Sequence, residues 1–329
     1  MRIKNGTRWC PTPYKDMNKQ DYSAQTIRTE NGCLLELVPE FGGLTNRLQF
    51  ATDQGPVDVI AGLPDRGAME TDKYFRGIPI FPLVNRLRDG RYAFEGKDYQ
   101  LPLNEPSRNN ALHGLLHHLK PEVEVTNGAN VSEAKLRYVY TGEEKGYPFP
   151  VDVVISYRLK SDSSLDAEFL VHNRHHTAIP VGIGWHPWFS LSLPLDELQL
   201  KLPKVRRLAV DSRLLPTGER PEDRTFEQLH SLNGIALDDC YEVQQSSQGE
   251  TVSVLLWSEK RQLGVEMWQQ TGERAFNFIQ VCTAPDRQSV AIEPVSCGID
   301  AFNTGDGLIA LPAEDSFTAR MGVRLVTAV

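Results

Sequence analysis

Turn-forming residues are spread along the whole chain, and this feature limits the fold more than any other. The 329 residues include 25 Gly and 21 Pro, which are not gathered into one linker, so turns punctuate short segments throughout. Between the turns, apolar residues alternate with polar ones. Arg91–Phe94 and Asp98–Leu101, for example, flank Glu95-Gly96-Lys97, a pattern typical of a β-hairpin. The sequence therefore predicts an all-β protein, built as a large antiparallel β-sandwich.

The same alternation predicts further strands and leaves little room for helices. Thr225–Leu232 is the best helical candidate, with Thr225 as its N-cap, and the polar region from Lys120 to Ala134 is interpreted as a loop. We expect residues 1–25 to form an N-terminal arm and residues 26–329 to form a single sandwich domain. The further predicted strands are Cys33–Val38, Leu136–Tyr140, Val151–Leu159, Ser164–Asn173, Val252–Ser258, Gly264–Gln269, Phe276–Cys282, Val290–Pro294 and Thr318–Leu325.

Charge and cysteine content narrow the range of partners. The chain has 35 Lys+Arg against 43 Asp+Glu, a formal net charge of -8, which argues against nucleic acid as a partner. No apolar run approaches the ~18 residues of a membrane helix, and no signal-peptide core follows the first residues. The five cysteines are widely spread with no Cys-x-x-Cys spacing, so we expect a cytoplasmic protein without structural zinc.

Two segments in the first half of the chain hold candidate site residues. Arg86 follows an apolar run, and its guanidinium fork suits two neighbouring acceptors on a ligand, although a surface arginine with a buried stem is an alternative. His113 precedes Gly114, which would let a ligand or another strand approach the backbone. His113 and His117 have the i, i+4 spacing of metal ligands, but the Glu of His-Glu-x-x-His is missing. We predict no metal, and structural roles stay open for His113, His117 and His118.

Aromatic residues surround a third candidate, His186. Pro187 favours an extended backbone at His186, which places the imidazole at a strand end or in a loop. Trp185, Trp188 and Phe189 flank it. Aromatic faces with a polar group between them suit a sugar, whose C–H face stacks on the rings while its hydroxyls form hydrogen bonds. Packing of the three aromatics in the core is the alternative.

A carboxylate in an apolar strand is the fourth candidate. Glu293 lies in Val290–Pro294, and carboxylates seldom occupy such a run unless they are paired or functional. Burial raises the proton affinity of a carboxylate, which makes it a better general base near neutral pH. Gln280 lies on the preceding apolar strand, and Asp238 and Asp239 come before it. On their own, the two aspartates predict a turn rather than a site.

The order and approximate spacing of these motifs resemble those of the aldose 1-epimerase (galactose mutarotase) family. The resemblance covers about residues 30–326 and implies a galactose mutarotase-like supersandwich that acts on a small-molecule sugar without a cofactor. The motifs that carry it are Asn85-Arg86-Leu87 with Gly90, Leu112-His113-Gly114, His186 with the aromatics after it, Leu237-Asp238-Asp239 with Tyr241, and Ile292-Glu293-Pro294.

The resemblance also implies roles for individual residues. Glu293 matches the base that takes the proton from the C1 hydroxyl, and His186 matches the acid that protonates the ring oxygen. His113 matches a second histidine that holds the substrate near that oxygen. Arg86 and Asp238 match residues that orient hydroxyls. Gln280 is expected to line the same pocket. From the aromatic environment of His186, we expect the pocket wall to consist of Trp185, Trp188 and Phe189.

Two departures from the family pattern leave the sugar open. The family motif Asn-His-x-Tyr-Phe-Asn-Leu is replaced by Trp185–Leu191, and Glu293 leads into Pro294-Val295 where Pro-Gln is common. The segment after Glu293 is more similar to divergent bacterial members. We expect an aldose 1-epimerase that exchanges sugar anomers, as a monomer or a homodimer.

Two alternatives remain. One is a hexose-6-phosphate mutarotase, in which Arg88, Arg91 or Arg108 would meet the phosphate. The other is a carbohydrate-binding protein that has lost catalysis, although binding alone does not require an acid and a base.

Overall fold

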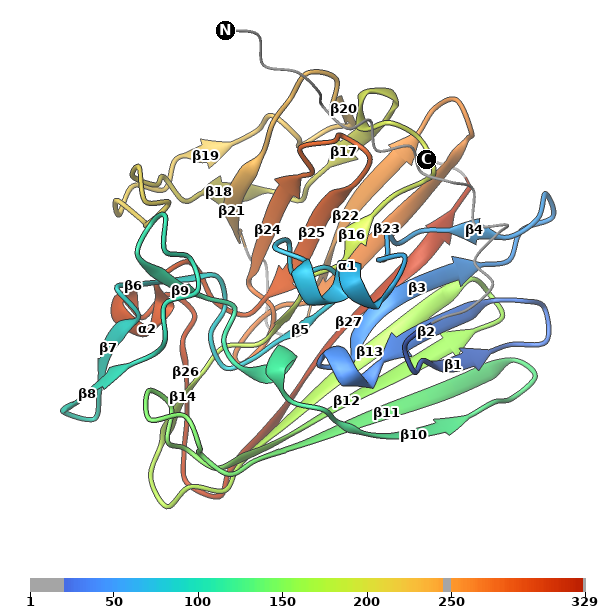
Figure 1. Ribbon diagram of the computed structural model, residues 1–329. Coiled ribbons are helices and arrows are strands. Elements are labelled where there is room, and N and C mark those ends of the chain that lie inside the picture. Colours follow the sequence, from blue (N-terminus) through green and yellow to red (C-terminus); the bar gives the residue numbers. More distant parts are fainter. Residues whose placement is uncertain (1–20, 245–249, 328–329) are drawn as a thin grey trace, which may run out of the picture.

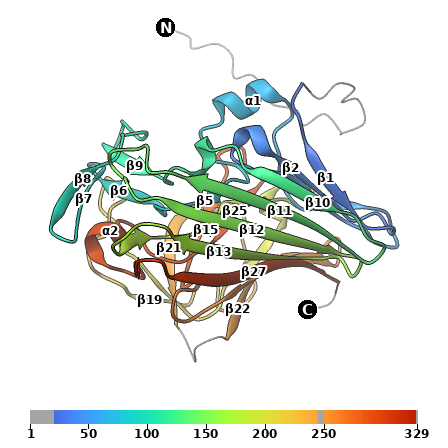
Figure 2. The same ribbon diagram turned by 90° about the horizontal axis from the view of Figure 1, so that it is seen from below.

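Two large antiparallel sheets face each other in the computed structural model, which describes residues 21–244 and 250–327 (Figure 1). The larger sheet has nine strands, and its long members run side by side in Figure 2. Their order across the sheet is β10 (Glu122–Thr126), β11 (Val131–Tyr140), β12 (Val151–Lys160), β13 (Ser164–Asn173), β27 (Ser316–Val326), β23 (Leu263–Gln270), β22 (Thr251–Ser258), β17 (Gln199–Lys201) and β20 (His230–Ser231).

The second sheet has eight strands and carries most of the predicted site residues. Strand β16 pairs with β25, beside the main path. The order along that path is β19 (Glu222–Asp223), β18 (Val205–Arg207), β21 (Asp238–Val243), β24 (Phe278–Thr283), β25 (Val290–Val295), β15 (Gly184–Trp185) and β5 (Pro79–Ile80), with β16 at Trp188–Phe189.

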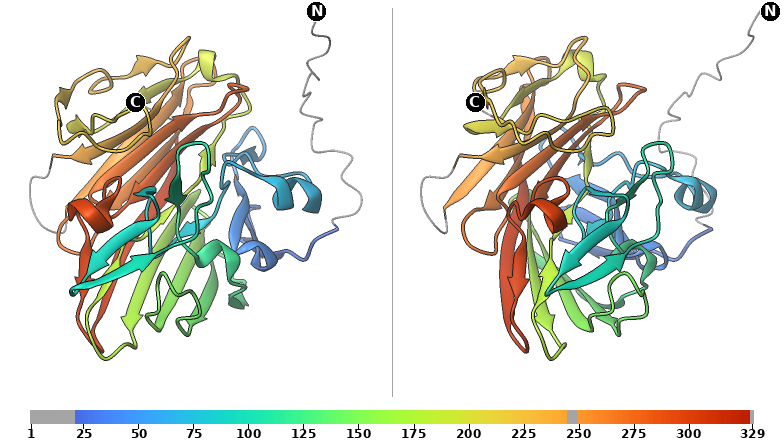
Figure 3. Two further views of the ribbon diagram at one scale, coloured as in Figure 1. Left: turned by 60° about the vertical axis from the view of Figure 1, so that its left-hand side comes forward. Right: turned by 90° about the vertical axis from the view of Figure 1, so that its left-hand side faces the viewer.

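Smaller sheets and short helices complete the fold. Figure 3 shows the β7–β8 hairpin at one end of the molecule, next to helix α2. One small sheet contains four strands, in the order β1 (Gln25–Arg28), β2 (Leu34–Val38), β3 (Leu44–Phe50) and β4 (Val57–Asp58). The two-stranded sheets pair β6 (Arg86–Arg88) with β9 (Asn110–Leu112), β7 (Arg91–Phe94) with β8 (Lys97–Gln100), and β14 (Ile179–Val181) with β26 (Ile309–Leu311). The helices are α1 (Arg66–Thr71), α2 (Ala301–Thr304) and the 3-10 turns η2 (Pro39–Phe41), η3 (Leu116–His118) and η4 (Leu195–Glu197).

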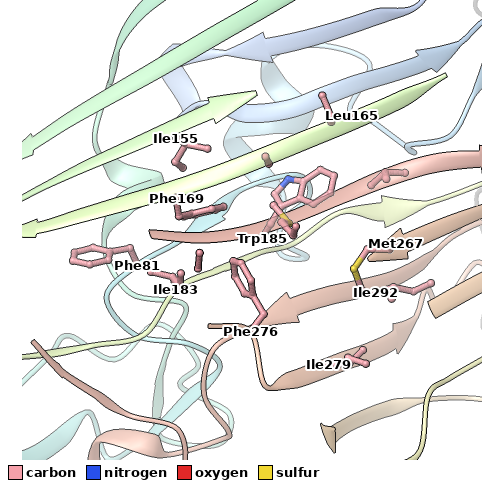
Figure 4. Close-up of a cluster of buried hydrophobic side chains, with 14 of the residues drawn as sticks. Phe81, Ile155, Leu165, Phe169, Ile183, Trp185, Met267, Phe276, Ile279 and Ile292 are labelled. Atoms are coloured by element: carbon pink, nitrogen blue, oxygen red, sulfur yellow. The ribbon is translucent and has the colours of Figure 1, made fainter. Parts of the chain in front are cut away.

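The core lies between the inner faces of the two large sheets. Alternation of buried and exposed residues is strict along β11 and strong along β13, so each strand turns one apolar face inward. Figure 4 shows Phe169 of β13 and Met267 of β23 among side chains of the other sheet, such as Ile292 of β25. Burial of these faces is the main force that joins the layers.

The structure confirms the all-β prediction and every predicted strand, with ends displaced by a few residues at most for all but one. The exception is Leu136–Tyr140, which is the second half of β11. The hairpin at Arg91–Phe94 is also confirmed, with a turn at Glu95-Gly96 where both residues have positive φ. Most of the predicted N-terminal arm, residues 1–20, lies outside the described residues, and Gln25 already belongs to β1.

Three expectations about local structure are wrong. Thr225–Leu232 is not a helix, because the backbone groups of Phe226 and Leu232 pair with Leu202 and Leu198. The expected loop from Lys120 to Ala134 contains β10, a charged strand at the edge of the nine-stranded sheet, and such edge strands resist edge-to-edge association. Asp238 and Asp239 begin β21 rather than forming a turn. Within the described residues, no helix has the length and apolar character that a membrane span needs.

Candidate active site

Three elements bring the predicted acid and base residues together. Glu293 lies on β25, directly opposite Gln280 of β24. His186 follows β15, and its backbone N–H donates to the carbonyl of Ile78 at 3.0 Å. His113 follows β9, and its N–H donates to the carbonyl of Asn85 at 3.1 Å. The site is therefore fixed by backbone pairing at each of its three members.

These three side chains form one buried cluster. Each offers one nitrogen or oxygen atom, and these atoms lie within 4.8 Å of one another. His186 Nε2 is 3.3 Å from Glu293 Oε1, and the rings of His113 and His186 meet edge to face with centroids 5.0 Å apart. The exposed fraction is 5% for each histidine and 2% for Glu293. Such a concentration of buried ionisable groups is typical of a functional site.

Burial sets the protonation of the cluster. Burial lowers the pKa of His186 to about 3, and the charge of Arg76 adds to this effect. Burial also lowers the pKa of His113 well below its usual range. The pKa of Glu293 is raised well above its ordinary value, first by burial and then by the charge of Asp238. The raised pKa of Glu293 and the lowered pKa of His186 therefore place the proton of this contacting pair on the carboxyl group rather than on the imidazole.

Each member of the cluster also has one buried polar atom without a partner. His113 Nδ1, His186 Nδ1 and Glu293 Oε2 lack a hydrogen-bond partner among the residues that the structure describes. Leaving a buried polar atom unpaired costs roughly 1–3 kcal/mol. Atoms of this kind gather where a ligand supplies the missing hydrogen bonds.

The predicted hydroxyl-orienting residues lie in a second, connected group. Gln280 Nε2 donates to Asp238 Oδ1 at 2.8 Å, and Asn85 Nδ2 donates to Gln280 Oε1 at 3.0 Å. Arg86 Nη2 lies 3.5 Å from Asp238 Oδ2. The side chain of Asp238 is 38% exposed, so this group connects the buried cluster to solvent. The structure thus brings together Arg86, Asp238 and Gln280, and their roles toward sugar hydroxyls stay a prediction.

Glu105 was missed by the sequence reasoning. It accepts hydrogen bonds from Arg86 Nε at 3.1 and 3.2 Å and from Asn110 Nδ2 at 2.9 Å. Burial alone would raise the pKa of Glu105, but these hydrogen bonds hold it below its ordinary value. Glu105 therefore fixes the guanidinium of Arg86 beside Asp238. It lies in a polar stretch with no sequence signal that separates it from a surface residue.

Phe75 was also missed. Its ring stacks against His186 with centroids 6.4 Å apart and meets His113 and His117 edge to face at 4.9 and 5.5 Å. His113 and His117 do not share a helix, since His113 has a φ of 59° and His117 lies in the short turn η3. The expected close approach at Gly114 is present, because a Cβ there would lie 2.5 Å from the carbonyl oxygen of Phe81.

The two predicted tryptophans lie behind the site. Trp185 is 1% exposed and belongs to the main core (Figure 4). Trp188 is equally buried, stacks against His186 with ring centroids 5.9 Å apart and donates from Nε1 to the carbonyl of Tyr74. Their role as a pocket wall stays a prediction, and in this structure Trp188 supports the imidazole of His186.

The cluster also has the chemistry of a metal site. Two imidazoles and one carboxylate are ligands that zinc and related ions accept, and His113, His186 and Glu293 are close enough to share an ion. Protonation competes with metal binding, because ligands must be deprotonated. The raised pKa of Glu293 therefore favours proton chemistry near neutral pH.

Comparison with known proteins identifies relatives over most of the chain. Residues 24–324 match the family model of aldose 1-epimerase. A protein of Escherichia coli (strain K12) described as uncharacterized protein YihR is 30% identical over 246 residues, which cover 71% of this chain and 74% of that protein. Galactose mutarotase of Rattus norvegicus is 29% identical over 215 residues, covering 55% of this chain and 59% of the relative.

Solved structures share the fold. A galactose mutarotase-like protein from Clostridium acetobutylicum superposes with a TM-score of 0.79 at 20% identity, over 90% of this chain and 93% of that one. A GalM/aldose epimerase homologue from C. elegans has the same TM-score at 18% identity, over 93% and 100% of the two chains. At these identities the likeness concerns the fold, and it confirms the predicted mutarotase-like sandwich.

Proposed function

Because the chain belongs to the aldose 1-epimerase family, we propose that it interconverts the α and β anomers of an aldohexose or a related sugar. One observation carries the proposal. Two buried histidines and a buried glutamate converge, and each has a polar atom without a partner among the described residues. A sugar can satisfy these atoms with its ring oxygen and hydroxyls. Binding alone would not need two titratable groups in contact, whereas ring opening does.

The proposed reaction moves two protons. Glu293 takes the proton from the C1 hydroxyl, the C1–O5 bond breaks, and His186 gives a proton to O5. Rotation about C1–C2 exposes the other face of the aldehyde, and O5 then attacks C1 while the two groups return the protons. His113 holds the sugar near the ring oxygen. No step consumes a cofactor, so acid and base are restored at the end of each turnover.

The protonation of the cluster suits this exchange. In the free protein the raised pKa of Glu293 and the lowered pKa of His186 leave the proton of the pair on the carboxyl group. In the proposed complex this proton passes to His186 across their 3.3 Å contact, so that Glu293 is the carboxylate base and His186 the imidazolium acid. The sugar's C1 hydroxyl donates to the carboxylate and replaces the solvation that burial removed. The positive charge of Arg86 also lowers the pKa of Glu293, which favours the carboxylate form in the complex.

The arginines considered for a phosphate do not favour the hexose-6-phosphate alternative. Arg88 Nε lies 3.5 Å from Asp300, Arg91 Nε donates to Gln100 at 2.7 Å, and Arg108 Nη1 donates to Glu105 at 3.0 Å. A phosphate dianion calls for two or more convergent cations. Each of these three guanidinium groups already has a partner, so we propose an unphosphorylated sugar or one with a smaller charge at C6.

The test measures anomer exchange of glucose and galactose by NMR exchange spectroscopy. Wild-type protein should accelerate exchange of at least one sugar, and Glu293→Gln should lower that rate by at least ~10²-fold, the scale of one general acid–base group. Glu133→Gln is the matched control, because Glu133 is exposed on β11 and pairs with Arg158. Absence of acceleration would refute the proposed activity. Near-wild-type exchange in a folded Glu293→Gln protein would remove Glu293 from the mechanism.

A further inference from the structure

The aromatic residues that flank His186 in the sequence are covered by the rest of the protein. Trp185 and Trp188 are each 1% exposed, and Phe189 is 0% exposed. Trp185 and Phe189 belong to the main core, and Trp188 packs in a smaller apolar cluster. A sugar binds to an aromatic residue by laying its C–H groups on the open face of the ring. In this structure none of the three rings presents such a face.

Phe75 differs from these residues because its side chain is only partly buried. Its ring lies nearly parallel to that of His186, at an interplanar angle of 27° with centroids 6.4 Å apart, and meets the ring of His113 at 61° and 4.9 Å. Within the described residues, the other aromatic side chain apart from histidine that contacts either imidazole is Trp188. Phe75 is therefore the partly exposed aromatic ring at the buried cluster.

The backbone holds Phe75 in an unfavourable conformation. Its φ of 51° lies in the left-handed region, which costs free energy for a bulky residue. Hydrogen bonds fix the loop on both sides of it. The carboxylate of Asp72 accepts from the N–H of Arg76 at 2.8 Å, and the N–H of Gly77 donates to the carbonyl of His186 at 2.8 Å. Strain that is imposed in this way is common at ligand-binding sites.

The polar groups of the site follow one another from the histidines away from Phe75. His186 contacts Glu293 at 3.3 Å, Glu293 lies opposite Gln280 in the sheet, and Gln280 donates to Asp238 at 2.8 Å. Phe75 and Asp238 thus stand at opposite ends of one series of contacts, an apolar ring at one end and a carboxylate at the other. A pyranose has the same division, because its hydroxyls project from the rim and its C–H groups lie on its faces.

We propose that Phe75 is a substrate-binding residue, on which the C–H face of a pyranose stacks while His113 and His186 reach the ring oxygen. The inference rests on the proposed function, because it places the ring oxygen at the two histidines. That oxygen is a member of the sugar ring, so a sugar held there brings its neighbouring ring carbons to a side chain that contacts both imidazoles. Stacking depends on C–H groups and not on charge, so neutral and charged pyranoses should both depend on Phe75.

The test measures kcat and KM for anomer exchange of glucose and galactose in wild type, Phe75→Leu and Phe75→Tyr. Phe75→Leu keeps an apolar side chain but loses the ring, so KM should rise about tenfold, the scale of one aromatic stacking contact, while kcat and its pH profile stay unchanged. Phe75→Tyr keeps the ring and should keep the low KM. Phe94→Leu is the matched control, because Phe94 on β7 is also partly buried and contacts Phe149.

Two kinetic results would overturn the inference and leave the proposed function intact. One is an unchanged KM in folded Phe75→Leu. The other is a fall in kcat or a shifted pH profile at unchanged KM, which would mean that Phe75 only supports the imidazole of His186. If no sugar is exchanged, the proposed function fails, and NMR titration with 1,5-anhydroglucitol and 1,5-anhydrogalactitol then decides. These probes keep the pyranose ring but lack the anomeric hydroxyl. Binding about tenfold weaker in Phe75→Leu and unchanged in Phe94→Leu would support the inference, whereas binding that is absent or independent of Phe75 would overturn it.

Discussion

Replacement of Glu293 by Gln should remove a loss of folding stability that grows with pH in the wild-type protein. Glu293 is 2% exposed on β25, and its pKa is raised by burial and by the charge of Asp238. In the unfolded chain a glutamate has a pKa of about 4.3 and loses its proton below neutral pH. The folded protein keeps that proton, so it binds more protons than the unfolded chain in this range. The free energy of unfolding therefore falls as pH rises from about 4.3 toward the raised pKa.

The size of the effect follows from proton linkage. One proton of difference changes the free energy of unfolding by about 1.4 kcal/mol per pH unit. Gln cannot titrate, so between pH 5 and pH 7 the stability of Glu293→Gln relative to wild type should improve by up to roughly 3 kcal/mol, the limit set by one proton over two pH units. Urea unfolding of both proteins at pH 5, 6 and 7 measures this difference, with Glu133→Gln as the exposed control. A difference that stays constant with pH would show that folded Glu293 is ionised and would refute the reasoning.

Three other predictions concern the site. In the NMR exchange assay, His186→Asn and His113→Asn should both lower the anomer-exchange rate, His186→Asn more strongly. The rates of His117→Asn and His118→Asn should stay close to that of wild type. A larger loss of rate at His117 than at His186 or His113 would contradict this order. Dialysis against EDTA should leave the rate unchanged, because the proposed steps move only protons, and loss of activity restored by zinc would instead assign a metal to the cluster of His113, His186 and Glu293. Glucose 6-phosphate should have a kcat/KM below that of an unphosphorylated aldohexose, and a tenfold preference for the phosphate ester would favour the hexose-6-phosphate alternative.

Most of the fold was predictable because a strand that is buried on one face alternates apolar and polar residues along its sequence. In Val151–Lys160 and Ser164–Asn173, alternate side chains enter the core, so local pattern and tertiary environment agree. In Thr225–Leu232 they disagree. Phe226, Leu229 and Leu232 follow one another at the i, i+3 spacing of a helix, yet Phe226 and Leu232 are buried where their backbone pairs with distant segments. A pattern of eight residues is too short to resist such tertiary contacts.

The site was predictable only where a polar residue interrupts an apolar run. Glu293 and His186 stand out in this way, and the structure places both in the buried cluster. Phe75 and Arg76 lie in a loop without alternation, and their importance comes from contacts with His186 and Trp188 that arise only in three dimensions. Trp185 is the opposite case. Its place next to His186 in the sequence suggested a site residue, but its side chain is part of the core.

The convergence of the site depends on strand register, which no single motif contains. Gln280 lies opposite Glu293 on one side and opposite Cys240 on the other. Asp238 is two residues before Cys240, so the carboxylates of Asp238 and Glu293 project from the same face of the sheet as the amide of Gln280. A slip of one residue in β24 would turn Gln280 to the opposite face and remove its hydrogen bonds with Asn85 and Asp238. The apolar residues that fix this register, and not the polar motifs, therefore determine whether the candidate acid, base and orienting groups meet.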